Sequence, residues 1–489
     1  MVFSDLFFLF FFLPLQLLIC SFIDTTKKRN VVLLIFSLIF YAWGEPVYIL
    51  LLIGMTFINW FFSLLIDVCP DKAKAKKFLI INVALSLLLI GIFKYTGFFA
   101  ENLKTLFSLD IITPKIPLPI GISFYTFQLI SYTVDVYRGE AKCATKFHEL
   151  LLYASLFYQC IAGPIVRYSD VQLEIQSRKR SFTSMGKGVQ RFSVGLAKKT
   201  LLANSCGKLV DMILLSDAEL ADLSSLSDNI EILSSRPAAM LWLGMIFYTL
   251  QIYLDFSAYS DMAIGMGLME GFHFKENFRY PYTAVSVTDF WRRWHISLSS
   301  FFRDYVYIPL GGNRKGTVRT ILNLLVVWLL TGFWHGASWN FILWGLYYFI
   351  FLVAEKLFLS KILKKLPNFI TNLYTLTVVF FGWLLFRFSE TSVLFTVFKG
   401  MFCMNGNSMF SAETTAVFTS NLFFLVIAIL AVTPLMTNLR RLLSNRAKYN
   451  KKLLKAKCVI YAAVPAVLII LSVFSVVGNS YNPFLYFQF

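Results

Sequence analysis

Long apolar runs separated by short polar segments dominate this sequence and predict its fold class. A helix needs about 20 apolar residues to cross the hydrocarbon core of a bilayer, and stretches near that length recur along the chain. The clearest runs cover residues 6–23, 31–43, 46–66, 78–93, 189–209, 238–272, 320–333, 341–354, 368–386, 422–436 and 458–477. The pattern predicts an all-α polytopic membrane protein with about 11–14 transmembrane or re-entrant helices.

The middle of the chain departs from this regular pattern. One apolar stretch covers residues 117–137, and another, residues 148–166, is broken by Gly163-Pro164. Broken segments are tolerated at membrane depth only where protein or a water-filled cavity satisfies the freed backbone groups. We therefore expect the helices to surround a passage.

Composition and charge agree with a membrane protein. The chain of 489 residues is 57% hydrophobic and 15% charged, whereas soluble domains carry about 25% charge. The net charge of +18 would also suit a nucleic-acid-binding protein. Here, however, the basic residues cluster between the apolar runs, as the positive-inside bias predicts. We interpret these clusters as cytoplasmic and expect lipid, not nucleic acid, as the partner.

His335 is the first candidate for chemistry among the four histidines. It lies 16 residues beyond Arg319, so a helix would place it ~24 Å from the cytoplasmic end of that segment. That depth is past the midplane of a core of ~30 Å, where an ionisable group normally faces a cavity or the bundle interior. A neutral imidazole can take a proton from a hydroxyl. The alternative is a structural histidine at the tip of a hairpin, the kind of role we assign to His148 and His273.

His295 ends the motif Asp289-Phe290-Trp291-Arg292-Arg293-Trp294-His295, and Arg303 follows it closely. Two interpretations stay open. These residues would form an interfacial belt with snorkelling arginines, or they would line the mouth of a substrate passage where arginine contacts phosphates or a carboxylate.

Other kinds of site receive little support. The Gly-rich basic segment 308–316 would suit phosphate groups, but it lacks the Gly-Lys-Ser/Thr ending of a P-loop. Cys160 would be an acyl acceptor, although a buried cysteine is commonly inert. We expect no metal, because the sequence has no Cys-x-x-Cys and no histidine pair at metal-ligand spacing.

Taken together, the motifs resemble the membrane-bound O-acyltransferase (MBOAT) family. The two histidine motifs, residues 289–299 and 330–340, carry most of the likeness, and the segments that add to it are residues 119–124, 161–167, 255–265, 302–305 and 308–314. The likeness covers nearly the whole chain and favours the alginate O-acetyltransferase branch. The D-alanyl transferase branch shares the histidine pieces but lacks the 308–314 run. Tyr158 stands where this branch has proline, which affects the expected local helix geometry.

The resemblance implies one MBOAT membrane domain over residues 1–489, with N-terminal helices in 1–100, a catalytic core in 117–355 and C-terminal helices in 367–489. It implies a multi-pass protein of the bacterial inner membrane that uses acetyl-CoA as donor substrate and holds no cofactor. The acetyl group would cross the membrane for O-acetylation of an extracytoplasmic polysaccharide, with an SGNH-type acetyltransferase as partner. D-alanyl or other acyl transfer to teichoic acid or another cell-wall polymer, and transport without chemistry, are the alternatives.

The resemblance and the residues together define an expected site around a buried histidine. We expect His335 to act as general base and His295 to orient or stabilise groups in the same passage. Trp334 and Asn340 would donate hydrogen bonds to a developing oxyanion. The residues expected to bind substrate, besides these two, are Asp289, Trp291, Arg292, Arg293 and Arg303.

Overall fold

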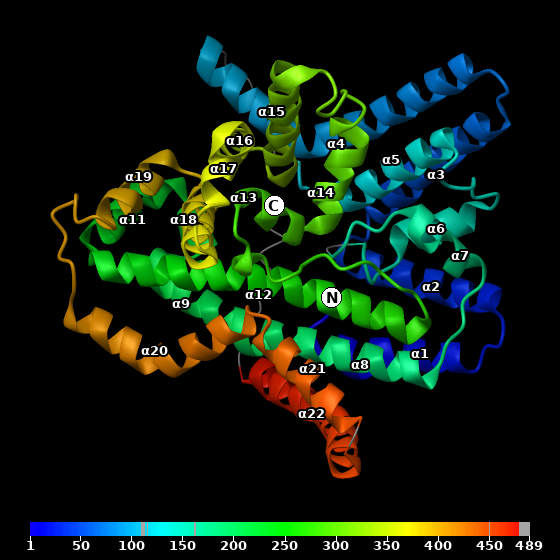
Figure 1. Ribbon diagram of the computed structural model, residues 1–489. Helices are drawn as coiled ribbons and strands as arrows, with labels where there is room; N and C mark the ends of the chain where they lie inside the picture. The colour runs from blue at the N-terminus through cyan, green and yellow to red at the C-terminus, as the bar shows by residue number, and fades with distance from the viewer. Residues whose placement is uncertain (109–112, 115, 161–162, 449, 479–489) are drawn as a thin grey trace. The chain divides into compact units, whose positions relative to one another are not determined.

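The computed structural model describes residues 1–108, 113–114, 116–160, 163–448 and 450–478, and this part of the chain contains helices and no strands (Figure 1). The all-α fold class is therefore confirmed. Within the described residues, eight helices are long and apolar enough to cross a membrane: Ile49–Val68, Lys72–Phe107, Ala238–Glu270, Gly316–His335, Trp339–Leu363, Asn368–Arg387, Ala412–Ala431 and Lys452–Val477. The protein is a multi-pass membrane protein.

The chain forms two compact units, and segments of the two units alternate along the sequence. Unit 1 comprises Met1–Gly195, Tyr259–Asn277 and Ile296–Pro309, and unit 2 comprises Leu196–Ala258, Phe278–His295 and Leu310–Phe489. Two central segments, Tyr259–Asn277 and Ile296–Pro309, belong to unit 1, and the single domain with three consecutive regions expected from the sequence stays a prediction. Both histidine motifs have their imidazoles in unit 2.

Unit 1 holds the N-terminal helices and the irregular middle of the chain. Its helices are η1 (Phe8–Phe12), α1 (Leu13–Ser21), α2 (Thr26–Gly44), α3 (Ile49–Val68), α4 (Lys72–Phe107), α5 (Ile122–Arg138), α6 (Phe147–Ser155), α7 (Tyr168–Gln176), most of α8 (Phe182–Ala197), α14 (Ile296–Phe302) and η5 (Arg303–Tyr307). The broken middle forms α5 and α6, both shorter than a membrane span. Nearly every residue of α5 is buried, so protein covers its many polar side chains.

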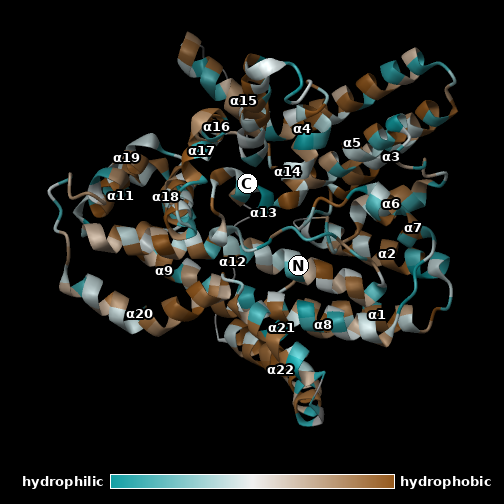
Figure 2. Ribbon diagram, in the orientation of Figure 1, coloured by the Kyte–Doolittle hydropathy of each residue, from teal (hydrophilic) through white to brown (hydrophobic). Residues whose placement is uncertain are grey.

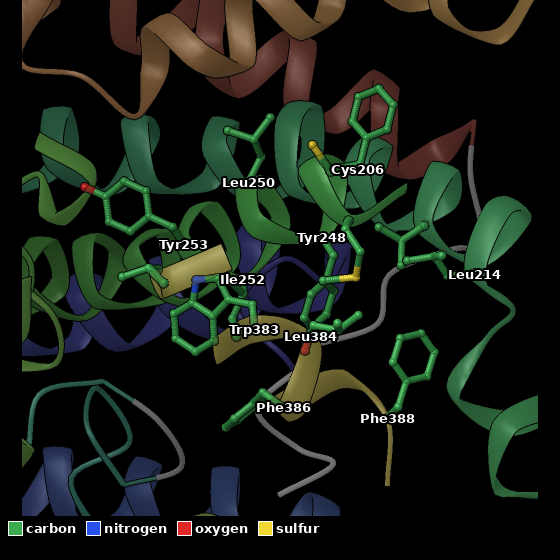
Figure 3. Close-up of a cluster of buried hydrophobic side chains, with 14 of the residues drawn as sticks. Cys206, Leu214, Tyr248, Leu250, Ile252, Tyr253, Trp383, Leu384, Phe386 and Phe388 are labelled. Carbon is green, nitrogen blue, oxygen red and sulfur yellow. The ribbon is translucent and has the colours of Figure 1, made fainter. Parts of the chain in front are cut away.

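Unit 2 contains the C-terminal half and the larger apolar core. Its helices are η2 (Lys198–Ala203), α9 (Asn204–Leu214), α10 (Asp217–Ala221), η3 (Leu223–Ser225), α11 (Leu226–Ser235), the first part of α12 (Ala238–Glu270), η4 (Pro281–Thr283), α13 (Val287–Arg293), α15 (Gly316–His335), α16 (Trp339–Ala354), η6 (Glu355–Leu359), α17 (Ser360–Leu363), α18 (Asn368–Arg387), α19 (Thr391–Gly400), α20 (Ala412–Ala431), α21 (Leu435–Ala447) and α22 (Lys451–Val477). Figure 3 shows part of the core, where Trp383 and Phe386 of α18 lie among buried side chains that include Tyr248 and Tyr253 of α12.

Helices α15 and α16 form the hairpin expected from the apolar runs 320–333 and 341–354. Their backbones approach closely because two glycines face the partner helix. A Cβ on Gly332 would overlap the carbonyl oxygen of Phe341, and a Cβ on Gly345 would overlap that of Trp328. The absence of side chains at these two positions therefore permits the hairpin packing.

The helices differ in how much of their apolar surface is covered by protein. Figure 2 shows α20 and α22 as hydrophobic along much of their length, and both are mostly exposed. In contrast, most of the span within α12 is buried inside the protein. Exposed apolar helices of this length are typical of contact with lipid.

Candidate active site

His335 is the last residue of α15 and is 5% exposed. The helix continues without interruption from Gly316, so the whole interval from Arg319 to His335 is helical, as the ~24 Å separation requires. Gly336 to Ser338 then turn the chain into α16. The imidazole thus lies at the tip of the α15–α16 hairpin.

Aromatic rings surround the His335 imidazole. The ring centroids of Trp334 and Trp344 each lie 5.0 Å from it, that of Phe386 lies 5.3 Å away, and that of Phe341 lies 6.4 Å away. These rings come from α15, α16 and α18 and carry no formal charge. Segments that are distant in the sequence therefore form an apolar wall around one ionisable group.

His295 lies just after α13, and its backbone is in the left-handed region with φ of +44°. Residues other than glycine seldom adopt this conformation, and such strain clusters at functional sites. The side chain is 1% exposed and meets the Phe256 ring edge-on at 4.7 Å. The local backbone therefore turns the imidazole into the interior of unit 2.

Trp334 connects the two histidine motifs. Its ring centroid lies 5.8 Å from that of His295 and 5.0 Å from that of His335. The indole is 4% exposed. The structure thus brings together three of the expected site residues, with two imidazoles against one buried indole.

Glu355, a residue that the sequence did not single out, anchors the short helix before His295. Its carboxylate accepts hydrogen bonds from the backbone N–H groups of Val287 at 2.6 Å and Thr288 at 2.9 Å, and it is 3% exposed. A carboxylate at a helix N-terminus satisfies N–H groups that have no partner within the helix and complements the helix dipole. The sequence signal that could have identified Glu355 is an acidic residue at the end of an apolar run.

The aromatic residues of the first motif belong to the core. Trp291 lies 4.8 Å from Tyr348 and 4.9 Å from Trp328, and Trp294 lies 4.8 Å from Trp383, in each case between ring centroids. Trp291 and Trp294 are 8% and 3% exposed. They therefore pack inside unit 2 and do not form an interfacial belt in this structure.

The charged residues of the same motif lie on the outer side of α13. Arg293 donates to Asp289 across one helical turn at 2.9 Å and to the Thr283 hydroxyl at 3.3 Å, and both ion-pair partners are partly exposed. Arg292 is exposed. Asp289 and Arg293 thus pair with each other, Arg292 is open to solvent, and the expected substrate contacts of these three side chains stay predictions.

Asn340 ties the hairpin tip to α18. Its Nδ2 donates to the carbonyl oxygens of Leu385 at 3.4 Å and Phe386 at 3.3 Å, and its Oδ1 accepts from the Ser338 hydroxyl at 2.6 Å. The amide nitrogen is thus engaged with the backbone, and a hydrogen bond to substrate would have to displace these contacts.

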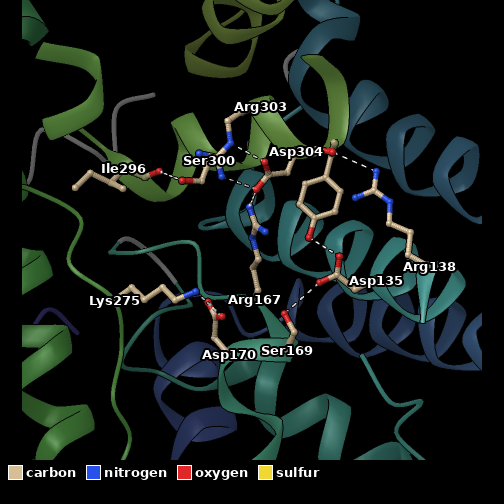
Figure 4. A network of polar contacts seen from close by, with 11 residues as sticks. Asp135, Arg138, Arg167, Ser169, Asp170, Lys275, Ile296, Ser300, Arg303 and Asp304 are labelled. Atoms are coloured by element: carbon tan, nitrogen blue, oxygen red, sulfur yellow. Dashed lines mark hydrogen bonds and ion pairs between the residues drawn. The ribbon is translucent and has the colours of Figure 1, made fainter. Parts of the chain in front are cut away.

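Arg303 belongs to unit 1, in the polar network of Figure 4. It and Arg167 both donate to the carboxylate of Asp304 at 2.6 Å. Tyr305 donates from its hydroxyl to Asp135 at 2.6 Å, and the Arg167 guanidinium lies 5.1 Å from the Tyr305 ring. Partial burial opposes ionisation of Asp304, but the hydrogen bonds from Arg303 and Arg167 outweigh it and lower the pKa of this carboxyl.

Cys160 is the remaining candidate for chemistry, and its role as an acyl acceptor stays a prediction. The cysteine is 1% exposed and belongs to unit 1. Ile161 and Ala162, which belong to the motif noted at residues 161–167, lie outside the described residues. Burial of this kind is typical of a cysteine that fills space.

The family model of MBOAT, the membrane-bound O-acyltransferase family, matches residues 145–398. This match covers more than half of the chain and includes both histidine motifs. The chain belongs to this family, and the protein is an O-acyltransferase.

Relatives place it in one branch of the family. The chain is 35% identical to the probable alginate O-acetylase AlgI of Pseudomonas putida over an alignment of 505 positions that covers both chains completely. It is 32% identical to the peptidoglycan O-acetyltransferase of Helicobacter pylori, covering 84% of this chain and 81% of that one. It is 25% identical to the teichoic acid D-alanyltransferase of Bacillus subtilis, covering 55% and 68%. The expected resemblance to the alginate O-acetyltransferase branch is confirmed.

Proposed function

We propose that this protein moves an acetyl group from cytoplasmic acetyl-CoA across a bacterial inner membrane for O-acetylation of an extracytoplasmic polysaccharide. The observation that carries the proposal is the pair of buried imidazoles in contact with Trp334. The names of the Pseudomonas putida and Helicobacter pylori relatives favour acetyl as the acyl group and a cell-envelope polymer as the acceptor. An SGNH-type acetyltransferase outside the membrane would complete the transfer.

His335 acts as the general base in this proposal. Its imidazole removes the proton from an acceptor hydroxyl as the hydroxyl oxygen attacks the thioester carbonyl. The C–S bond then breaks, and the departing sulfur takes the proton back from His335, which leaves the ester and free CoA. The position of the ring at the end of a continuous helix supports this role, because a catalytic group held in the right geometry lowers the entropic part of the barrier.

The neighbouring residues have distinct parts in the same step. Trp334 contacts both imidazoles and carries an indole N–H that would donate to the developing oxyanion. His295 orients the acceptor or the thioester on the other side of this indole. Asn340 fixes the tip of the hairpin through its hydrogen bonds to α18.

The charge pattern supports this direction of transfer. Basic segments such as residues 314–319 would hold the CoA phosphates on the cytoplasmic side. His335, ~24 Å along α15 from Arg319, would meet the thioester beyond the midplane and nearer the acceptor.

D-alanyl transfer to a cell-wall polymer is the second candidate. The teichoic acid D-alanyltransferase of Bacillus subtilis supports it, at lower identity and over about half of this chain. The donor distinguishes the two, since one enzyme consumes an acetyl thioester and the other a D-alanyl thioester.

The test uses the purified full-length protein in proteoliposomes, with radiolabelled acetyl-CoA and separately a D-alanyl thioester as donors. We expect acetyl-CoA to be consumed and His335→Gln to lower the rate by a factor of about 10² to 10⁴. His273→Gln is the matched control, because this imidazole is 65% exposed and pairs with Glu174. Full activity of the His335 variant would refute the base, and exclusive use of the D-alanyl donor would favour the second candidate.

A further inference from the structure

A hairpin of α21 and α22 carries a concentrated positive charge. Eight basic residues and no acidic residue occur in this stretch: Arg440, Arg441, Arg446, Lys448, Lys451, Lys452, Lys455 and Lys457. The last acidic residue of the sequence is Glu413. Arg441, Arg446 and Lys448 are exposed, so their charges are available to an anionic partner.

Helix α21 also presents an apolar stripe. The residues that form it are spaced for one face of a helix and are between 41% and 60% exposed: Leu435, Met436, Leu439, Leu442 and Leu443. Figure 2 shows α21 with both hydrophobic and hydrophilic residues. A helix with an apolar stripe and arginines beside it is typical of the bilayer interface.

Side-chain contacts hold α21 beside the first turns of α22. Arg440 donates from Nε to the Tyr461 hydroxyl at 2.6 Å, and Lys457 donates from Nζ to the Ser444 hydroxyl at 2.8 Å. The two helices therefore run side by side over the first turns of α22. The span Lys452–Val477 has 26 residues and is ~39 Å long, which exceeds a hydrocarbon core of ~30 Å. Its basic first turns, and α21 beside them, would lie at headgroup level.

We propose that α21 is an interfacial helix that binds the headgroups of anionic phospholipids. The leucine stripe enters the outer acyl region, next to the lipid-exposed face of α22, while Arg441, Arg446 and Lys448 pair with headgroup phosphates. An acidic soluble protein would match the positive charge, but it would not account for the exposed apolar stripe. This inference does not depend on the proposed function, because it concerns lipid selection and not acyl transfer.

The test measures lipid selectivity of the purified full-length protein in phosphatidylcholine vesicles. The probes are spin-labelled phosphatidylglycerol and spin-labelled phosphatidylcholine, and the readout is the fraction of each that the protein immobilises. We expect the wild type to select phosphatidylglycerol. We expect R441Q/R446Q/K448Q to lower this selectivity by at least about fivefold, since each basic residue near the surface contributes about 1 kcal/mol, which corresponds to a factor of about five.

Two further variants separate this surface from a general charge effect. K361Q/K364Q/K365Q removes the same charge from exposed lysines at the end of α17 and should retain most of the selectivity. L439S/L442S/L443S keeps every cation and should lose selectivity, because the helix no longer enters the bilayer. Equal loss in both charge variants, full selectivity in the leucine variant, or no preference in the wild type would overturn the inference.

Discussion

The segment that ends at His295 and the segment that begins at Arg303 are close in sequence but differ in composition and contacts. The first places Trp291, Trp294 and His295 in an aromatic interior in unit 2. The second, in unit 1, joins Arg303, Asp304 and Tyr305 to partners through ion pairs and hydrogen bonds. One continuous motif of arginines and aromatic residues thus serves two physical purposes. In the first segment uncharged rings pack into the core beside His295, and in the second charged groups connect helices.

This difference separates two kinds of mutational effect. Changes around the imidazoles should alter chemistry more than folding, because they act on the reacting groups. Changes in the charged network should alter stability, with a dependence on pH. The following predictions test that separation in order of decreasing effect.

Among the following four substitutions, the largest effect is expected from His295→Asn. Asparagine tolerates the left-handed backbone at φ of +44°, so the fold should persist while the imidazole is lost. We expect the initial rate of acetyl transfer to fall about a hundredfold, with an unchanged thermal unfolding curve. His148→Asn should leave the rate unaltered, and a fully active His295 variant would remove this residue from the site.

Glu355→Ala should reduce both stability and activity. It leaves the buried N–H groups of Val287 and Thr288 without their acceptor, at a cost of about 2–3 kcal/mol in the free energy of unfolding. Because α13 positions His295, transfer should slow as well. Thermal unfolding in detergent and the transfer rate measure the two effects, and Glu355→Gln, which keeps one acceptor oxygen, should recover part of each.

Asp304→Asn should mainly change stability, by about 1–2 kcal/mol at neutral pH. The pKa of this carboxyl is lowered in the folded protein, so its contribution is present above the usual value of 3.8 and is lost as the pH falls through the lowered pKa. Unfolding of wild type and variant should therefore converge in acid. A constant difference down to the lowest pH would contradict the charged network.

The smallest effect is expected from Arg292→Gln. The side chain is exposed, so the free energy of unfolding should change by less than about 0.5 kcal/mol. If Arg292 contacts the donor, as the motif predicts, KM for acetyl-CoA should rise while kcat is retained. Unchanged KM and kcat would exclude this arginine from substrate binding.

The sequence predicted the hairpin around His335 well, because two apolar runs flank a polar turn. It overestimated the length of the helix in the first apolar run, residues 6–23, because the described helix ends at Ser21. Arg29 donates to the Ile23 carbonyl just beyond that end, a contact that hydropathy does not reveal. His335 was identifiable from its depth and its motif, and His295 from its motif alone.

The partners of the site residues were not predictable. Phe256 and Phe386 reach the histidines from helices distant in the sequence, and Asp304 meets Arg167 across 137 positions. Such pairings arise from tertiary packing and leave no local periodicity. For the same reason, Asn340 resembled a free donor in the sequence although its amide faces two carbonyl groups of α18.

The glycines of the α15–α16 hairpin also bear on how the candidate base moves. Gly332 and Gly345 bring the two backbones together, so we expect the two helices to move as one rigid unit. Repositioning the backbone of His335 between steps would then require both helices to tilt together. Rigid-body shifts of this kind take microseconds to milliseconds and are therefore slower than side-chain rotation.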